Sequence, residues 1–182
     1  MDDKHQELII AGMGGQGVML IGQLLAHATV MEGRNVVWFP AYGPETRGGT
    51  AHCTVIISSE EIGSPVSSSP DALIALTQPL LDQFAPSVRR EGTILVNTSL
   101  AQPPDYRDDC KIVEVPATDL AADLGSSKVA NMVMLGAYVA LARLVALDSV
   151  KAAMPEVLPK RHHQFIPLNS AALDRGAATI NG

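Results

Sequence analysis

Closely spaced glycines that follow a short apolar run constrain this chain more than any other feature. The segment 8–18 begins with aliphatic residues, and Gly12, Gly14 and Gly17 have the G-x-G-x-x-G spacing of dinucleotide-binding turns. This pattern predicts a strand, a tight turn and a helix whose free N–H groups and dipole favour an anion at the turn. A close crossing of strand and helix without a ligand is the alternative. The candidate binding turn consists of Gly12, Gly14, Gly15, Gln16 and Gly17.

The length and composition favour a single domain that spans residues 1–182. Hydrophobic residues make up 47% of the chain and charged residues 18%, which is typical of a globular protein with a sizeable core. The net charge is −6 and no basic run occurs, so we expect neither nucleic acid nor an anionic membrane as a partner. The polar N-terminus and the short apolar stretches favour a cytoplasmic protein without a membrane span.

The cysteines and histidines do not form a recognisable metal site. Cys53 and Cys110 are the only cysteines, and two separated thiols cannot by themselves hold an iron–sulfur cluster or a structural zinc. A disulfide between them is conceivable, but the expected cytoplasmic location favours free thiols. His162 and His163 are adjacent, yet no third ligand is near them in sequence. We therefore expect no metal site on this chain.

Apolar runs alternate with helical periodicities along most of the chain. This alternation predicts an α/β fold, a Rossmann-like and mainly parallel sheet with helices on both faces. The segment 36–39 is expected to be a buried parallel strand that forms a right-handed βαβ unit with the first strand. The segment 62–66 is compatible with either a short return strand or an extended loop. Further strands are predicted at 50–58, 72–76, 92–97 and 111–115, and helices at 18–32, 78–88, 119–124, 129–145, 149–157 and 169–178.

The helix predicted at 129–145 is apolar on nearly all sides. Such a helix lies either in the centre of the core or under a partner subunit. Gly136, Ala137 and Ala140 would let another element pack tightly against it. If a partner covers this Met-rich helix, an isolated chain could form a homodimer through it.

A loop with two prolines follows the second predicted strand and contains Arg47. The planar guanidinium of Arg47 suits a phosphate or carboxylate, and a surface ion pair between Glu45 and Arg47 is the alternative. A nicotinamide-binding unit needs an acidic residue at the end of this strand, where the sequence 39–41 is Phe-Pro-Ala. The candidate binding residues in the loop are Glu45, Thr46, Arg47 and Gly48.

Asn97 ends the strand predicted at 92–97, where its side chain would face a cleft at the sheet edge. A turn cap is the alternative role. No nucleophile–base arrangement, G-x-S-x-G elbow or H-E-x-x-H motif occurs. We therefore expect no catalytic residue on this chain.

Several of these stretches occur together in one known family. In order, they are Gly12–Val18, Tyr42–Ala51, Ile57–Ser58 with Ile62–Pro65, Pro70–Asp71 and Asn131–Ala137. With these motifs the chain resembles the gamma subunit of 2-oxoacid:ferredoxin oxidoreductases, and it is most similar to the 2-oxoglutarate and branched-chain 2-oxoacid types. The beta subunit of indolepyruvate oxidoreductase shares the domain, but the form of the loop at 42–45 makes that assignment less favoured.

The resemblance implies a division of labour within a complex. Such complexes oxidatively decarboxylate a 2-oxoacid with coenzyme A, giving an acyl-CoA, carbon dioxide and reduced ferredoxin. Thiamine diphosphate and iron–sulfur clusters are expected on the alpha, beta and ferredoxin-like delta subunits, with none of these cofactors on this chain alone. We hypothesise that the glycine turn and Arg47 hold either a phosphate of coenzyme A or a carboxylate of a partner subunit.

Two other kinds of function stay open at this point. The first is a free-standing Rossmann-like oxidoreductase that binds a nucleotide or flavin, which would bind NAD or flavin in isolation. The second is an assembly protein without a ligand, in which partner side chains would fill the turn.

Overall fold

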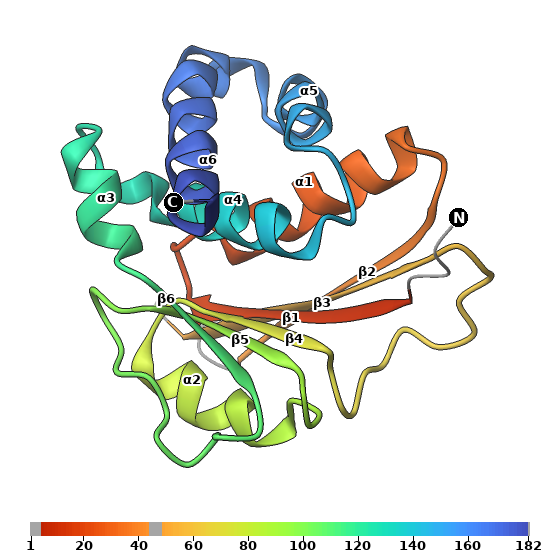
Figure 1. The fold of residues 1–182 in the computed structure, drawn as a ribbon. Coiled ribbons are helices and arrows are strands. Elements are labelled where there is room, and N and C mark those ends of the chain that lie inside the picture. The colour runs from red at the N-terminus through yellow and green to blue at the C-terminus, as the bar shows by residue number, and fades with distance from the viewer. Residues whose placement is uncertain (1–4, 44–48, 182) are drawn as a thin grey trace.

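A six-stranded sheet with the order β2-β3-β1-β4-β5-β6 forms the centre of the molecule (Figure 1). The computed structural model describes residues 5–43 and 49–181. Its strands are β1 (Gln6–Met13), β2 (Asn35–Tyr42), β3 (Thr50–Ser58), β4 (Ala72–Ala75), β5 (Thr93–Asn97) and β6 (Lys111–Val115). The pairs β1–β4, β4–β5 and β5–β6 are parallel, whereas β3 runs antiparallel to both β1 and β2. The predicted α/β class with a mainly parallel sheet is confirmed.

Helices cover both faces of the sheet, but unequally. In Figure 1, α2 lies on one face and the other five helices lie on the opposite face. The helices are α1 (Val18–Met31), α2 (Gln78–Phe84), α3 (Ala117–Asp123), α4 (Ala130–Ala142), α5 (Leu147–Val157) and α6 (Ile166–Asn181). Short 3-10 turns are η1 (Ala85–Ser87), η2 (Ser127–Val129) and η3 (Lys160–Phe165). Because the helices that follow β1 and β4 lie on opposite faces, the winding changes direction between these two strands.

The second strand was predicted to lie beside the first in the sheet, and this prediction is wrong. β2 lies at the edge and pairs only with β3, so β1 and β2 are not neighbours and do not form the expected unit of adjacent parallel strands. No residue of β2 is buried, whereas β3 is buried from Cys53 to Ser58. The strand in the interior position is β3, although β2 has the more apolar sequence. Pro40 lacks an N–H group, which an edge strand tolerates.

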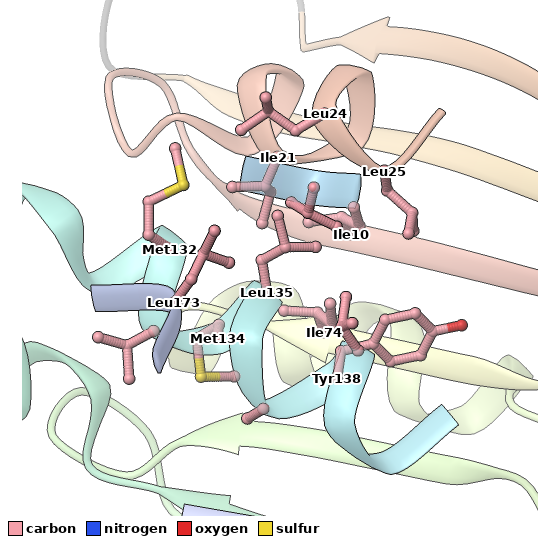
Figure 2. Packing of buried hydrophobic residues seen from close by; sticks show 14 of the residues in the cluster. Ile10, Ile21, Leu24, Leu25, Ile74, Met132, Met134, Leu135, Tyr138 and Leu173 are labelled. Carbon is pink, nitrogen blue, oxygen red and sulfur yellow. The ribbon is translucent and has the colours of Figure 1, made fainter. Parts of the chain in front are cut away.

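The long apolar helix lies at the centre of the main core. Figure 2 shows Met132, Met134 and Leu135 of α4 among side chains from the sheet, α1 and α6. These three residues are at most 1% exposed. The expectation that a partner could cover this Met-rich helix is wrong, because the chain's own C-terminal segment already does so. Self-association of the isolated chain through α4 is therefore not supported.

The element that packs tightly against α4 is α6. A Cβ atom added to Gly136 would overlap the carbonyl of Leu173, and one added to Gly176 would overlap the carbonyl of Val133. The two helix backbones thus touch where each carries a glycine. A second, smaller core lies under α2, where Leu80 and Leu81 pack with β1, β4 and β5.

Several element ends differ from the prediction. Helix α6 begins three residues earlier and ends three residues later than expected. The segment 62–66 is an extended loop, which is one of the two alternatives predicted for it. Helix α4 stops at Ala142, because Arg143 adopts a left-handed conformation with φ 52°. Across residues 5–43 and 49–181, no helix is both long and apolar enough to cross a bilayer.

Candidate functional site

The glycine turn connects β1 to α1 and is closed by its own glutamine. The Oε1 atom of Gln16 accepts the Met13 N–H at 2.7 Å, and the Gln16 N–H donates to the Met13 carbonyl at 3.1 Å. Gly12 belongs to the end of β1, so the turn itself comprises residues 14–17. The predicted strand–turn–helix unit is confirmed.

Two backbone amides of the turn have no hydrogen-bond partner among residues 5–43 and 49–181. The Gly14 N–H donates to the Gly49 carbonyl at 2.7 Å. Within the part of the chain that the structure describes, the amides of Gly15 and Gly17 make no hydrogen bond. Both residues have positive φ, 92° and 73°, and the first-turn amides of α1 follow directly. The turn therefore presents N–H groups at a positive helix end, as an anion site requires.

A small cavity of about 240 Å³ with both polar and apolar walls lies beside this turn. It is placed at the carboxyl ends of β1, β4 and β5, where the winding of the sheet changes direction and ligands bind in open α/β sheets. Gly15, Gln16 and Asn97 line it, so the structure brings together three of the predicted binding residues. The other lining residues are Leu76, Leu100, Thr118, Ser127, Lys128, Ala130 and Asn131.

Lys128 is the one cationic group in the described lining of this cavity, and that lining contains no carboxylate. Among the described residues, Lys128 forms no ion pair. Sequence reasoning missed both Lys128 and Thr118, because only the packing of α3 and η2 brings them to the sheet edge. Free amides and an unpaired ammonium group together suit a small anion.

Asn97 is held by hydrogen bonds within the chain. Its Nδ2 atom donates to the Leu76 carbonyl at 3.2 Å and to Thr118 Oγ1 at 3.0 Å. Its Oδ1 atom accepts the N–H groups of Ala117 and Thr118 at 3.1 and 3.3 Å, which caps the start of α3. These bonds use the whole hydrogen-bonding capacity of the amide. Asn97 therefore has the capping role that was the alternative to ligand binding. A contact between Asn97 and a ligand stays a prediction.

Four predicted binding residues, Glu45, Thr46, Arg47 and Gly48, lie outside the described residues. The residues that flank this segment are placed close to the turn. The Gly43 N–H donates to the Thr50 carbonyl at 2.8 Å, and Gly49 accepts the Gly14 N–H. The residues on either side of the segment, Gly43 and Gly49, therefore lie near the glycine turn.

The other titratable groups that the structure describes are spread over the molecule. Within residues 5–43 and 49–181, no group of three or more His, Cys, Asp and Glu side chains is suitably placed. Cys53 and Cys110 are free thiols, and burial raises the pKa of Cys53 to about 12. His163 contacts the Leu158 carbonyl through Nε2 at 2.9 Å.

Comparison with known proteins decides the family. The model of the pyruvate ferredoxin/flavodoxin oxidoreductase family matches residues 7–179. The chain belongs to this family. The resemblance inferred from the motifs is thereby confirmed.

Relatives in this family differ in length. Subunit VorA of ketoisovalerate oxidoreductase from Methanothermobacter thermautotrophicus is 43% identical over 92% of this chain, which covers 35% of VorA. The chain thus spans only about a third of that relative. Subunit KorC of 2-oxoglutarate synthase from Methanocaldococcus jannaschii is 33% identical over 86% of this chain and 85% of its own length.

Solved structures share the fold. The gamma subunit of a keto/oxoacid ferredoxin oxidoreductase from Geobacter sulfurreducens has a TM-score of 0.81 and 32% identity, with 97% of this chain and 98% of that chain covered. A 2-oxoglutarate:ferredoxin oxidoreductase from Magnetococcus marinus, solved with 2-oxoglutarate, coenzyme A and succinyl-CoA, has a TM-score of 0.90. It is 22% identical over 99% of this chain and 32% of that chain, so this likeness concerns the fold alone.

Proposed function

We propose that this chain is the gamma subunit of a cytoplasmic 2-oxoacid:ferredoxin oxidoreductase of the 2-oxoglutarate or 2-oxoisovalerate type. The complex would convert a 2-oxoacid and coenzyme A to an acyl-CoA and carbon dioxide, while ferredoxin accepts the electrons. Family membership over residues 7–179 and the near-equal length of KorC support this role. Thiamine diphosphate and the iron–sulfur clusters would reside on alpha, beta and ferredoxin-like delta partners.

The contribution of this chain would be to hold an anion beside the reacting centre. The observation that carries this part is the cavity that Lys128 and the glycine turn line together, whose described lining contains no carboxylate. A phosphate group of coenzyme A is the proposed occupant, and Arg47 would complete the site. Each charge-assisted hydrogen bond of this kind contributes about 1.5–3 kcal/mol. Binding and orienting the acceptor thiol require no acid or base from this chain.

A free-standing nucleotide oxidoreductase is less well supported. β2 ends at Tyr42, and no acidic residue stands at its described carboxyl end to hold the ribose of NAD. A pure assembly role would leave the cavity filled by a partner's carboxylate. Such a protein would influence complex formation and have no effect on coenzyme A affinity.

Co-purification from the native source tests the proposed complex. Subunits that carry thiamine diphosphate and iron–sulfur clusters should accompany the tagged chain, and the preparation should reduce ferredoxin only with a 2-oxoacid and coenzyme A. In that complex, Arg47→Ala should raise the KM for coenzyme A about tenfold, which corresponds to one charged hydrogen bond. An intact complex with an unchanged KM would exclude the binding role of Arg47. A chain that purifies without such partners would contradict the proposed function as a whole.

A further inference from the structure

A groove of about 520 Å³ lies where α1, η2, η3 and the start of α6 meet, and we call it the η3 groove. Among the polar side chains of its described lining, no buried atom lacks a hydrogen-bond partner, so nothing inside it calls for a small polar ligand. The ring of Phe165 is 48% exposed, although covering such a ring is favourable. The apolar part of the lining consists of Leu20, Val129, Leu158, Phe165 and Leu168.

The segments that form the η3 groove carry no carboxylates, in a chain that is acidic as a whole. The net charge is −6, from 19 Asp and Glu against 13 Lys and Arg, yet residues 124–147 and 157–173 contain no Asp or Glu. Lys128 belongs to the lining, and Lys160 and Arg161 begin η3. All three side chains are exposed. The groove therefore has an apolar centre and a cationic margin.

The charges on this margin are not compensated by residues 5–43 and 49–181. Within those ranges, Lys128, Lys160 and Arg161 form no ion pair. Arg161 only donates to the ring of His162 at 3.4 Å. By contrast, Lys151 on the neighbouring α5 contacts two carboxylates. The margin thus suits an acidic group from another molecule.

An apolar centre within a polar rim is typical of a protein–protein interface. The region that this chain matches makes up 35% of the relative VorA, so in VorA the same unit is joined to a larger protein. A second copy of this chain is a poorer occupant. A two-fold contact centred on the groove would bring the cations of both copies together, which is unfavourable.

We infer that the η3 groove docks an acidic, amphipathic segment of a partner subunit. Apolar side chains of that segment would cover Phe165 and Leu168, and its carboxylates would pair with Lys160 and Arg161. Because Lys128 lines both cavities, the docked segment would lie next to the anion site. This inference rests on the proposed function, since it takes the partner from the proposed complex.

Photo-cross-linking within the purified complex identifies the occupant. Phe165→p-benzoyl-L-phenylalanine places the reactive ketone at the groove. Tyr106→p-benzoyl-L-phenylalanine is the control, because Tyr106 is a similarly exposed aromatic residue in the loop before β6. Mass spectrometry should join residue 165 to a peptide of another subunit that carries a net negative charge. The control should not yield that peptide.

Charge reversal tests whether the cations contribute to docking. The double variant Lys160→Glu/Arg161→Glu is produced with a tag beside the untagged native chain, and its share of the purified complex is measured. Arg90→Glu/Lys111→Glu is the matched control, because both residues are exposed and lie just before β5 and at the start of β6. The groove variant should be incorporated about tenfold less than the control, with the same melting temperature of the full chain.

Equal incorporation of the two double variants would overturn the inference. So would a cross-link from residue 165 to a second copy of this chain or to a basic or neutral peptide, or an intact complex without any cross-link between subunits. Each of these results leaves the proposed function standing if the complex reduces ferredoxin with a 2-oxoacid. An acidic cross-linked subunit in an assembly without that activity would refute the proposed function and retain the docking surface. A chain that purifies alone would refute both.

Discussion

Asn131 donates a hydrogen bond from Nδ2 to the Gly17 carbonyl at 3.3 Å, across a sequence separation of 114 residues. This contact joins the start of α4 to the residue that caps α1. Gly17 has φ 73°, and a Cβ atom there would overlap the Asn131 amide. The anion site is therefore shaped by a contact between two distant segments.

Gly17→Ala should cost about 2–3 kcal/mol of unfolding free energy, because the positive φ and the overlap with Asn131 both oppose a methyl group. Gly15→Ala is the matched control. Gly15 also has positive φ, but a Cβ atom there meets nothing within 4 Å, so about 1 kcal/mol is expected. Urea unfolding measures both values. Equal losses of unfolding free energy in the two variants would show that the overlap with Asn131 does not destabilise an alanine at residue 17.

Gly136→Ala and Gly176→Ala should each destabilise the chain by about 3 kcal/mol or more, because the added methyl group must separate the backbones of α4 and α6. Gly63→Ala adds the same group where nothing lies within 4 Å, and it should change stability by less than about 0.5 kcal/mol. Thermal unfolding compares the three variants. Wild-type stability in either helix variant would mean that the helices can move apart at little cost.

Arg107→Met should destabilise the chain by about 3 kcal/mol, because Arg107 is 8% exposed and donates to the Ala85 and Val88 carbonyls and to Asp109. These contacts fix the loop before β6 to η1 and to the residue that follows it. Arg175→Met removes an exposed arginine of α6 and should be nearly neutral. Denaturant midpoints decide the comparison, and a small effect in both variants would contradict a structural role for Arg107.

We expect the free energy of unfolding to decrease as the pH falls, in part because His52 becomes protonated on unfolding. Its ring lies 4.7 Å from that of Phe84, and burial lowers its pKa below 6.5. Below about pH 6.5 the unfolded chain binds this proton more readily than the folded chain, so stability falls as the pH falls. His52→Gln should reduce the loss of unfolding free energy between pH 8 and pH 5.5, whereas the exposed His27→Gln should not. Identical losses in all forms would exclude His52 as the cause.

The sequence predicted features that depend on local chemistry. The strand–turn–helix unit at 8–18 and the end of the first helix at Gly33, which has φ 75°, both follow from glycine placement. The place of β2 could not be predicted in this way. The strands that neighbour each other in a sheet depend on contacts between distant segments, and here β3 takes the interior position although β2 has the more apolar sequence.

The candidate site was predictable only in part. Gly15 and Gln16 line the cavity as their motif indicates. Lys128 carries no local signal, because only the packing of α3 and η2 brings it to the cavity. Asn97 was predictable as a polar residue at a strand end, but its four hydrogen bonds become visible only when α3 is packed against β5.

The most direct measurement of the central claim is the KM for coenzyme A in the assembled complex with Lys128→Met. Its control is Lys111→Met, an exposed lysine at the amino end of β6, away from the carboxyl edge where the cavity lies. The account predicts a rise of about tenfold for Lys128→Met with kcat retained, and no change for Lys111→Met. Equal KM values for coenzyme A in both variants and the unmodified complex would contradict it.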